Sequence, residues 1–160
     1  MQHRPFLQRL MFWGCICGDG PLALVPMDGT MNAKKYIDTL TTHLVPFLEN
    51  QPLAQQYVFQ QDNAPCHKAN TTLTFFRENA IDVINDWPPY SPDLNIIENI
   101  WAFLKMKLRR YSIGTKAELI ARVREVWNNE DTKALCGRLA ASMRRRIDMC
   151  IQHRGGYTKY

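Results

Sequence analysis

The chain has 160 residues, of which 46% are hydrophobic and 22% are charged. This length and this balance predict one globular domain with a hydrophobic core, and they exclude an intrinsically disordered chain. The longest apolar run, residues 10–16, is about half as long as a membrane-spanning helix needs to be, so the sequence predicts no membrane span.

Charge is distributed unevenly along the sequence. Residues 1–100 contain 6 Lys and Arg against 10 Asp and Glu, whereas residues 101–160 contain 14 against 5, which gives the last third a net charge of +9. Such a segment is either a solvated helix surface or a surface that faces a polyanion such as nucleic acid. The five cysteines are irregularly spaced and fit neither a disulfide framework nor a paired zinc site, which favours an intracellular protein.

The chain begins with a predicted β-hairpin and a predicted helix. Residues 10–17 and 22–27 are apolar runs separated by the turn-forming letters GDGP, which places Asp19 at the tip of the hairpin. A helix then extends to about residue 50, because apolar residues recur at helical spacing from residue 36 onwards. Pro46 is expected to kink this helix.

The middle of the chain predicts strands that alternate with a helix. Residues 57–61 start with aromatic and β-branched residues and form a predicted strand, so Asp62 lies at its carboxyl end. A helix over residues 70–78 leads to a second predicted strand at residues 81–84, and the proline-rich residues 85–92 exclude regular structure. This alternation predicts an α/β sheet covered by helices.

The last part of the chain predicts three helices. Ser91 followed by Pro92 and Asp93 is typical of a helix start, and this first helix should continue to about residue 111. Its predicted apolar stripe consists of Leu94, Ile97, Trp101, Leu104 and Leu108. Glu98 lies at the margin of that stripe and is expected to point toward the protein. Helices over residues 116–128 and 132–152 follow, and the second of them carries the basic triplet Arg144, Arg145 and Arg146.

Asp62 and Glu98 together suggest a divalent-metal site. One acid is predicted to leave a sheet and the other to lie on the inner margin of a helix. Mg²⁺ prefers oxygen ligands and is commonly held by one or two carboxylates together with substrate phosphate. Two such ions can bind the attacking and leaving oxygens of a phosphoryl transfer. The alternative interpretation is that both acids are ordinary caps or surface residues, because such spacing is common.

Three separated motifs resemble one known family in the right order. The strings GPLALVPMDGTMN, QQDNAPCH and DWPPYSPDLNIIENIW are similar to the catalytic domain of mariner-superfamily DDE transposases. The resemblance implies an α/β RNase H-like fold, a three-layer mixed sheet flanked by helices, here with its first, central strand missing. It also implies that Asp62 and Glu98 are the second and third metal-binding carboxylates of that family.

The resemblance further implies an activity and partners. It implies metal-dependent cleavage and transfer of DNA strands, with Mg²⁺ or Mn²⁺ as the metal ion. The expected partners are transposon ends and target DNA in the nucleus, and a second copy of the chain in a possible homodimer. No membrane is expected to take part. Arg144, Arg145 and Arg146 are then candidate DNA contacts, because Lys and Arg neutralise phosphates. Residues 1–160 would be a partial catalytic domain, with the sheet and motifs in residues 10–111 and a basic helical part in residues 112–160.

The sequence departs from the family pattern in one important respect. The first catalytic Asp of the family precedes the WGC motif by a whole strand, and the first ten residues leave no room for that strand. Asp19 and Asp28 lie in predicted turns, where Asp commonly has a structural role, so neither is expected to substitute. The chain is therefore expected to be the C-terminal part of a transposase and to be inactive alone. A smaller departure is Ile96, which stands where the family usually has proline.

Two other functions compete with this interpretation. The chain could be a non-catalytic DNA-binding or protein-interaction remnant of a transposase that keeps its basic helices. It could also be a cysteine hydrolase that uses Cys66 and His67. Adjacent residues rarely present a nucleophile and a base to each other, and the sequence shows no evident acid to orient the histidine.

Overall fold

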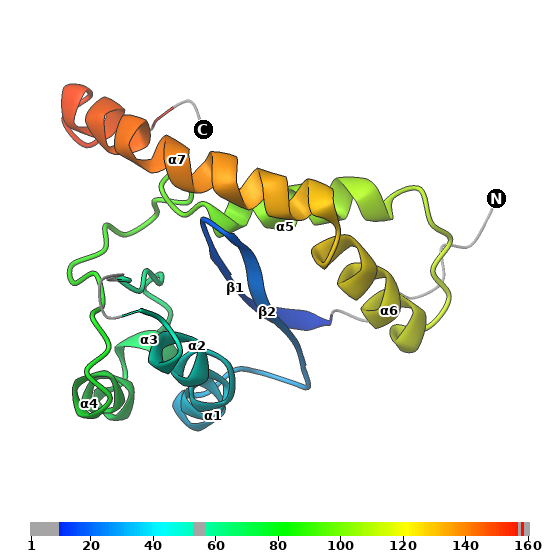
Figure 1. Cartoon of the computed structure of the whole chain (residues 1–160), viewed down its shortest axis with the longest axis horizontal. Coiled ribbons are helices and arrows are strands. Elements are labelled where there is room, and N and C mark those ends of the chain that lie inside the picture. Colours follow the sequence, from blue (N-terminus) through cyan, green and yellow to red (C-terminus); the bar gives the residue numbers. More distant parts are fainter. Residues whose placement is uncertain (1–9, 53–56, 157, 159–160) are drawn as a thin grey trace. The chain divides into compact units, whose positions relative to one another are not determined.

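The computed structural model describes residues 10–52, 57–156 and 158 (Figure 1). The described elements are, in chain order, β1 (Met11–Cys17), β2 (Gly20–Met27), α1 (Ala33–His43), α2 (Val45–Glu49), α3 (Pro65–Lys68), α4 (Asn70–Glu78), α5 (Ile97–Leu108), α6 (Lys116–Trp127) and α7 (Glu130–Gln152). They belong to two compact units, one of residues 1–29 and 91–160 and one of residues 30–90. None of the described helices is both long and apolar enough to cross a bilayer. The assignment of residues 1–160 to one partial catalytic domain stays a prediction.

The first unit contains the predicted hairpin. β1 and β2 pair antiparallel from Met11 opposite Met27 to Cys17 opposite Gly20, with a bulge between Cys15 and Ile16. Asp19 lies in the two-residue turn between the strands, which confirms its predicted place at the tip. Gly20, with φ of 139°, occupies a backbone conformation that other residues rarely adopt.

Three helices pack against this hairpin. α6 and α7 contact β2, while α5 and α7 contact β1 (Figure 1). The buried core of the unit consists of Ile100, Leu104, Val123, Val126, Trp127, Cys136 and Leu139. The indole rings of Trp101 and Trp127 stack with centroids 5.8 Å apart and planes inclined by 24°. Gly14 lies against both rings, because a Cβ built on it would be 2.7 Å from Cη2 of Trp101 and 3.0 Å from Cη2 of Trp127.

The second unit contains the four shorter helices. Asn32 caps α1 by accepting a hydrogen bond of 2.9 Å from the Lys35 N–H. The helix breaks at Leu44, and Pro46 lies at the start of α2, which confirms the expected kink. α4 (Asn70–Glu78) has the predicted bounds, whereas the short helix α3 was not predicted.

The two strands predicted in this unit are much shorter than expected. Residues 57–61 and 81–84 form a single parallel bridge between Phe59 and Val83. The Phe59 N–H donates to Asp82 O at 2.7 Å, and the Ile84 N–H donates to Phe59 O at 3.0 Å. A strand needs a neighbour along its length, and these two segments meet at only one position. The strand predictions are therefore wrong in extent, and the pairing of the two segments was not predicted.

The helix predicted to begin at Pro92, with Ser91 as its cap, begins at Ile97, which is five residues later. Residues 91–96 form successive turns, in which the Leu94 N–H donates to Ser91 O and the Asn95 N–H donates to Pro92 O, both at 3.2 Å. In an α-helix the carbonyl of Asp93 would accept from the N–H of residue 97. Instead it accepts a hydrogen bond of 2.6 Å from Nη1 of Arg146. A contact from α7 thus replaces the helical bond that the local sequence predicts.

Arg146 is a buried structural residue and not part of a uniformly exposed basic triplet. Its exposed fraction is 1%, and its Nε donates to Oγ of Ser142 at 2.9 Å. Arg144 and Arg145 are exposed, so the prediction that all three arginines face DNA needs correction for Arg146.

The carboxylate of Asp93 also accepts from the Thr158 N–H at 2.8 Å. Partial burial alone would raise the pKa of Asp93, but the hydrogen bonds to its carboxylate lower that pKa below its ordinary value.

Replacing Gly14 by Ala should destabilise the first unit. The added methyl would overlap the Trp101 ring, and overpacking of this kind costs about 1–3 kcal/mol. The free energy of unfolding, measured by circular dichroism in urea, should fall by that amount. Gly114→Ala is the matched control, because its nearest neighbour would be Oε2 of Glu118 at 3.6 Å, an ordinary contact. Equal stability of the two variants would contradict the packing at Gly14.

Replacing Arg146 by Met should also destabilise the chain. Methionine keeps an unbranched apolar stem but leaves the carbonyl of Asp93 without its donor, which costs about 1–3 kcal/mol. Arg144→Met removes the same charge from an exposed position and should change the free energy of unfolding by less than about 0.5 kcal/mol. Urea denaturation of both variants measures the difference. Similar effects at the two positions would show that Arg146 is not the structural residue described here.

Candidate metal-binding site

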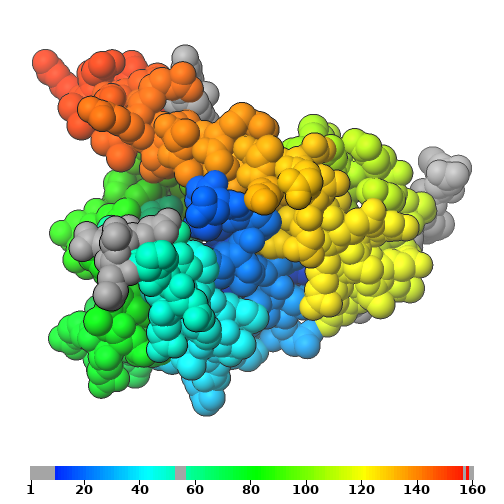
Figure 2. Space-filling model, viewed as in Figure 1, coloured from blue at the N-terminus to red at the C-terminus, as the bar shows by residue number. Residues whose placement is uncertain are grey.

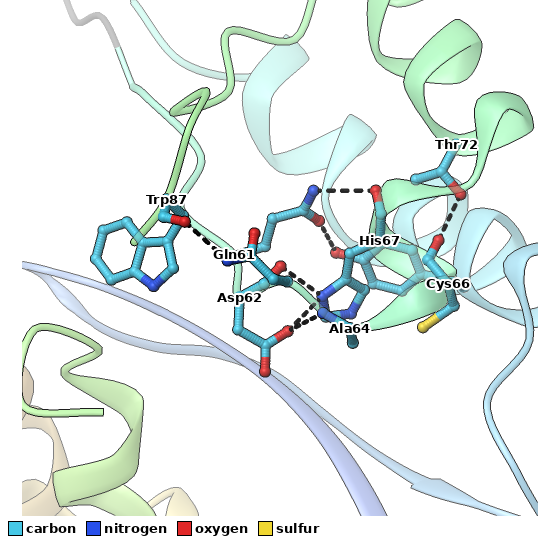
Figure 3. A network of polar contacts seen from close by, with 9 residues as sticks. Gln61, Asp62, Ala64, Cys66, His67, Thr72 and Trp87 are labelled. Atoms are coloured by element: carbon cyan, nitrogen blue, oxygen red, sulfur yellow. Dashed lines mark hydrogen bonds and ion pairs between the residues drawn. The ribbon is translucent and has the colours of Figure 1, made fainter. Parts of the chain in front are cut away.

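Asp62 lies three residues beyond the Phe59 bridge, in the turn that leads into α3. Its Oδ1 accepts a hydrogen bond of 3.0 Å from the Ala64 N–H and lies 2.7 Å from Nδ1 of His67 (Figure 3). The side chain is 56% exposed, so solvent and a ligand can reach it. Among the described residues, Oδ2 of Asp62 has no hydrogen-bond donor. One carboxylate oxygen is therefore held by the protein and the other is available.

The segment around Asp62 is fixed by side chains from its own unit. The hydroxyl of Tyr36 on α1 donates to Oε1 of Gln61 at 2.6 Å, and Nε2 of Gln61 donates to the His67 carbonyl at 3.4 Å. On the other side, Nδ2 of Asn63 donates to the carbonyl of Trp87 at 2.7 Å (Figure 3). The residues on either side of Asp62 therefore each have a partner that is distant in sequence.

Glu98 lies in the first turn of α5 and is exposed, so the expectation that it points toward the protein is wrong. The buried face of α5 is set by Ile100 and Leu104. Glu98 precedes Ile100 by two residues, and two residues correspond to about 200° around a helix, which is nearly the opposite face. Leu94, which was predicted to start the apolar stripe, precedes the helix altogether. An acid in a first helical turn is also favoured by the helix dipole, which is the structural alternative for Glu98.

Each of the two acids has the chemistry of a ligand for Mg²⁺ or Mn²⁺. Both side chains offer exposed carboxylate oxygens, which are the ligands these ions prefer. Asp62 belongs to the unit of residues 30–90, and Glu98 belongs to the unit of residues 1–29 and 91–160. In the part of the chain that the structure describes, no group of three or more His, Cys, Asp or Glu side chains is placed to hold a metal ion.

Asp19 and Asp28 have the structural positions expected from the sequence. Asp19 lies in the hairpin turn, and the carboxylate of Asp28 forms an exposed ion pair with Nζ of Lys116. An ion pair with a lysine competes with a metal ion for the carboxylate oxygens. Neither acid is therefore a good candidate for a further metal ligand.

The structure shows an acid next to His67 that the sequence analysis missed. Asp62 and His67 are five residues apart and meet because the turn before Pro65 brings them together. Burial, however, raises the pKa of the Cys66 thiol, which leaves less of the thiolate that a cysteine hydrolase needs. Nδ1 of His67 contacts Asp62. The geometry therefore favours an interaction of His67 with the Asp62 carboxylate over a role as the base that activates Cys66.

The candidate DNA contacts are reduced to two exposed arginines of α7. Arg144 and Arg145 are both exposed near the carboxyl end of that helix, whereas Arg146 is buried. In Figure 2 the orange surface of α7 borders the blue surface of the hairpin, in keeping with the contacts of α7 with β1 and β2.

Known proteins with similar sequences and structures are transposases. The transposable element Tcb1 transposase of Caenorhabditis briggsae is 31% identical over 151 residues, which cover 94% of this chain and 54% of that protein. The chain spans about half the length of the transposases it matches.

Two solved structures show the same fold. A Mos1 transposase catalytic domain with raltegravir and Mg matches with a TM-score of 0.84 at 18% identity, over 94% of this chain and 77% of that chain. A Mos1 transposase paired-end complex with the left transposon end matches with a TM-score of 0.81 at 20% identity, over 92% of this chain and 44% of that chain. The mixed α/β structure therefore has the RNase H-like fold of these catalytic domains, which confirms the predicted fold class.

The family follows from a match over most of the sequence. Residues 2–120 match the family model described as DDE superfamily endonuclease, and this range contains the hairpin, Asp62 and Glu98. The chain belongs to the DDE superfamily endonucleases and is homologous to the transposases of the Tc1/mariner group.

Proposed function

We propose that this chain is the part of a DDE-type transposase that supplies two carboxylates, Asp62 and Glu98, to a metal-dependent site for cleaving and joining DNA. One observation carries the proposal. Asp62, in a chain that belongs to the DDE superfamily endonucleases, has one carboxylate oxygen held by the protein and the other available to a ligand. Glu98 is exposed in the first turn of α5, where its carboxylate is likewise accessible.

Asp62 and Glu98 would hold Mg²⁺ or Mn²⁺ through carboxylate oxygens. When bound, such ions polarise a phosphodiester and activate the oxygen that attacks it. Mos1 catalytic domains have been solved with Mg and with Mn, which supports this choice of metal. The chain's own contribution is to fix the backbone around each acid: Gln61 and Asn63 are held on either side of Asp62, and Arg146 holds the turn before Glu98.

The substrate in this proposal is DNA. A Mos1 transposase has been solved with its left transposon end, which supports transposon-end and target DNA as partners of the full-length protein. Arg144 and Arg145 offer exposed positive charge for contacts to phosphate. A nuclear location and a homodimer are parts of the same proposal, because the substrate is chromosomal DNA and a transposon has two ends.

The chain by itself is proposed to be inactive. Two carboxylates can retain a hydrated ion, but the binding of both the attacking and the leaving oxygen by paired ions normally needs another ligand. The family's first Asp would be that ligand, and the two candidates in this sequence, Asp19 and Asp28, lie in a turn and in an ion pair.

Strand cleavage should depend on both acids once the third carboxylate is restored. The assay compares the 160-residue chain with a version extended at its start by a first-strand segment with Asp from a related transposase, both in Mn²⁺. The extended version should cleave DNA, and Asp62→Asn or Glu98→Gln should reduce its rate by more than the ~10–100-fold typical of outer-shell groups.

Asp38→Asn in the extended version is the control, because Asp38 is 61% exposed and pairs with Lys34 on the surface of α1. It should leave the rate unchanged. Robust cleavage by the 160-residue chain would contradict the proposal that a further carboxylate is needed for activity. A repaired enzyme that is indifferent to either substitution would contradict the site.

DNA binding by the chain should be weak, independent of sequence and sensitive to salt. Replacing Arg144 and Arg145 together by Ala should lower the affinity and reduce the slope of log K against log salt by about 0.9 for each phosphate that is no longer neutralised. Fluorescence anisotropy with labelled duplexes at several salt concentrations measures both quantities. The double change of Lys34 and Lys35 to Ala removes the same charge from exposed neighbours on α1 and serves as the control. Equal effects of the two double variants would indicate a general effect of charge.

A further inference from the structure

The contact between His67 and Asp62 does more than hold a local turn together. Nδ1 of His67 lies 2.7 Å from Oδ1 of Asp62 and 3.2 Å from the backbone oxygen of the same residue. Both neighbours of this nitrogen are oxygens of the kind that accept hydrogen bonds, so Nδ1 carries a proton and donates it. Together with the Ala64 N–H, the histidine places two donors on Oδ1 of Asp62.

This arrangement makes the two carboxylate oxygens different. Figure 3 shows one oxygen of Asp62 on the side of His67 and Ala64, and the other directed away from both. The terminal torsion of an aspartate is normally broad, because little restricts rotation of the carboxylate. Two donors on one oxygen restrict that rotation and keep the second oxygen in a constant direction, although the side chain is 56% exposed.

The histidine ring is itself fixed by the body of its unit. The rings of His67 and Tyr36 lie with centroids 4.3 Å apart and planes inclined by 34°, and Tyr36 is 1% exposed. The Tyr36 hydroxyl holds Gln61, whose amide in turn donates to the His67 carbonyl. Only 16% of the His67 side chain is exposed. The donor to Asp62 is therefore anchored through Tyr36 to helix α1.

We propose that His67 is a positioning residue for the metal-binding site, which fixes the Asp62 carboxylate through Oδ1 so that Oδ2 is presented to a divalent cation. The inference rests on the proposed function, since it takes Asp62 as a metal ligand. A carboxylate that is oriented before the ion arrives loses less freedom on binding, and such outer-shell partners strengthen metal binding. His67 touches neither the ion nor the DNA in this role.

Two substitutions of His67 separate its donor from its ring. His67→Asn keeps an N–H donor at the position of Nδ1 and removes the ring, because both nitrogens are attached to Cγ. His67→Phe keeps a ring that can pack on Tyr36 and removes the donor. The probe is Mn²⁺ alone, and the measurement is the free Mn²⁺ signal in electron paramagnetic resonance during titration of the 160-residue chain at one fixed pH. Thermal unfolding of each variant reports any structural effect separately.

The expected result is a loss of Mn²⁺ affinity in His67→Phe of about 10–100-fold, the usual effect of removing an outer-shell partner, with His67→Asn close to the unaltered chain. Asp62→Asn in the same titration tests the proposed function on its own.

If Asp62→Asn weakens binding and His67→Phe does not, the positioning role is wrong and the metal site stands. If His67→Asn and His67→Phe lose affinity equally, the ring and not the donor matters, and the proposal is again overturned. If Asp62→Asn binds Mn²⁺ as the unaltered chain does, the site itself is wrong, and the role of His67 falls with it.

Discussion

The hydrogen bond from buried Arg146 to the carbonyl of Asp93 sets where α5 begins. Without that contact, Ser91, Pro92 and Asp93 would favour a helix start at Ser91. With it, the carbonyl of Asp93 is taken by a side chain from α7, the turns of residues 91–96 remain outside the helix, and α5 starts at Ile97. Glu98 consequently lies in the first turn of α5 and not in the middle of a longer helix. Its exposed face follows from a separate cause, the burial of Ile100 and Leu104 on the other side of the same helix.

The two candidate ligands are positioned by different means. Asp62 is held through its own carboxylate and through its neighbours in sequence, by hydrogen bonds and an aromatic contact that lead back to Tyr36. Glu98 is held through the backbone, by the buried guanidinium of Arg146 and the packing of Ile100 and Leu104. The first arrangement fixes a side-chain direction, whereas the second fixes the start of a helix and leaves the side chain free. A carboxylate that is free to rotate can adjust to an ion whose position other ligands define.

The sequence predicted well the elements that depend on local interactions. The GDGP turn and the apolar runs on either side define the hairpin, Pro46 marks the break between α1 and α2, and α4 has the predicted bounds. Strands 57–61 and 81–84 were predicted from their composition, but strand length depends on partners distant in sequence, and only Phe59 and Val83 pair. The sequence also located Asp62 and Glu98 through motifs, but it could not show that Glu98 is exposed, that Arg146 is buried or that His67 meets Asp62. Each of these features depends on a contact whose direction the local pattern does not contain.

The stacked indoles of Trp101 and Trp127 make the first unit optically distinct. Two chromophores with centroids 5.8 Å apart and nearly parallel planes couple their electronic transitions, so their near-ultraviolet circular dichroism differs from that of isolated tryptophans. The second unit contains one tryptophan, Trp87, which has no such neighbour among the aromatic pairs of the described chain. The coupled signal therefore reports the packing of α5 on α6, and it can be followed while DNA or metal binds elsewhere on the same chain.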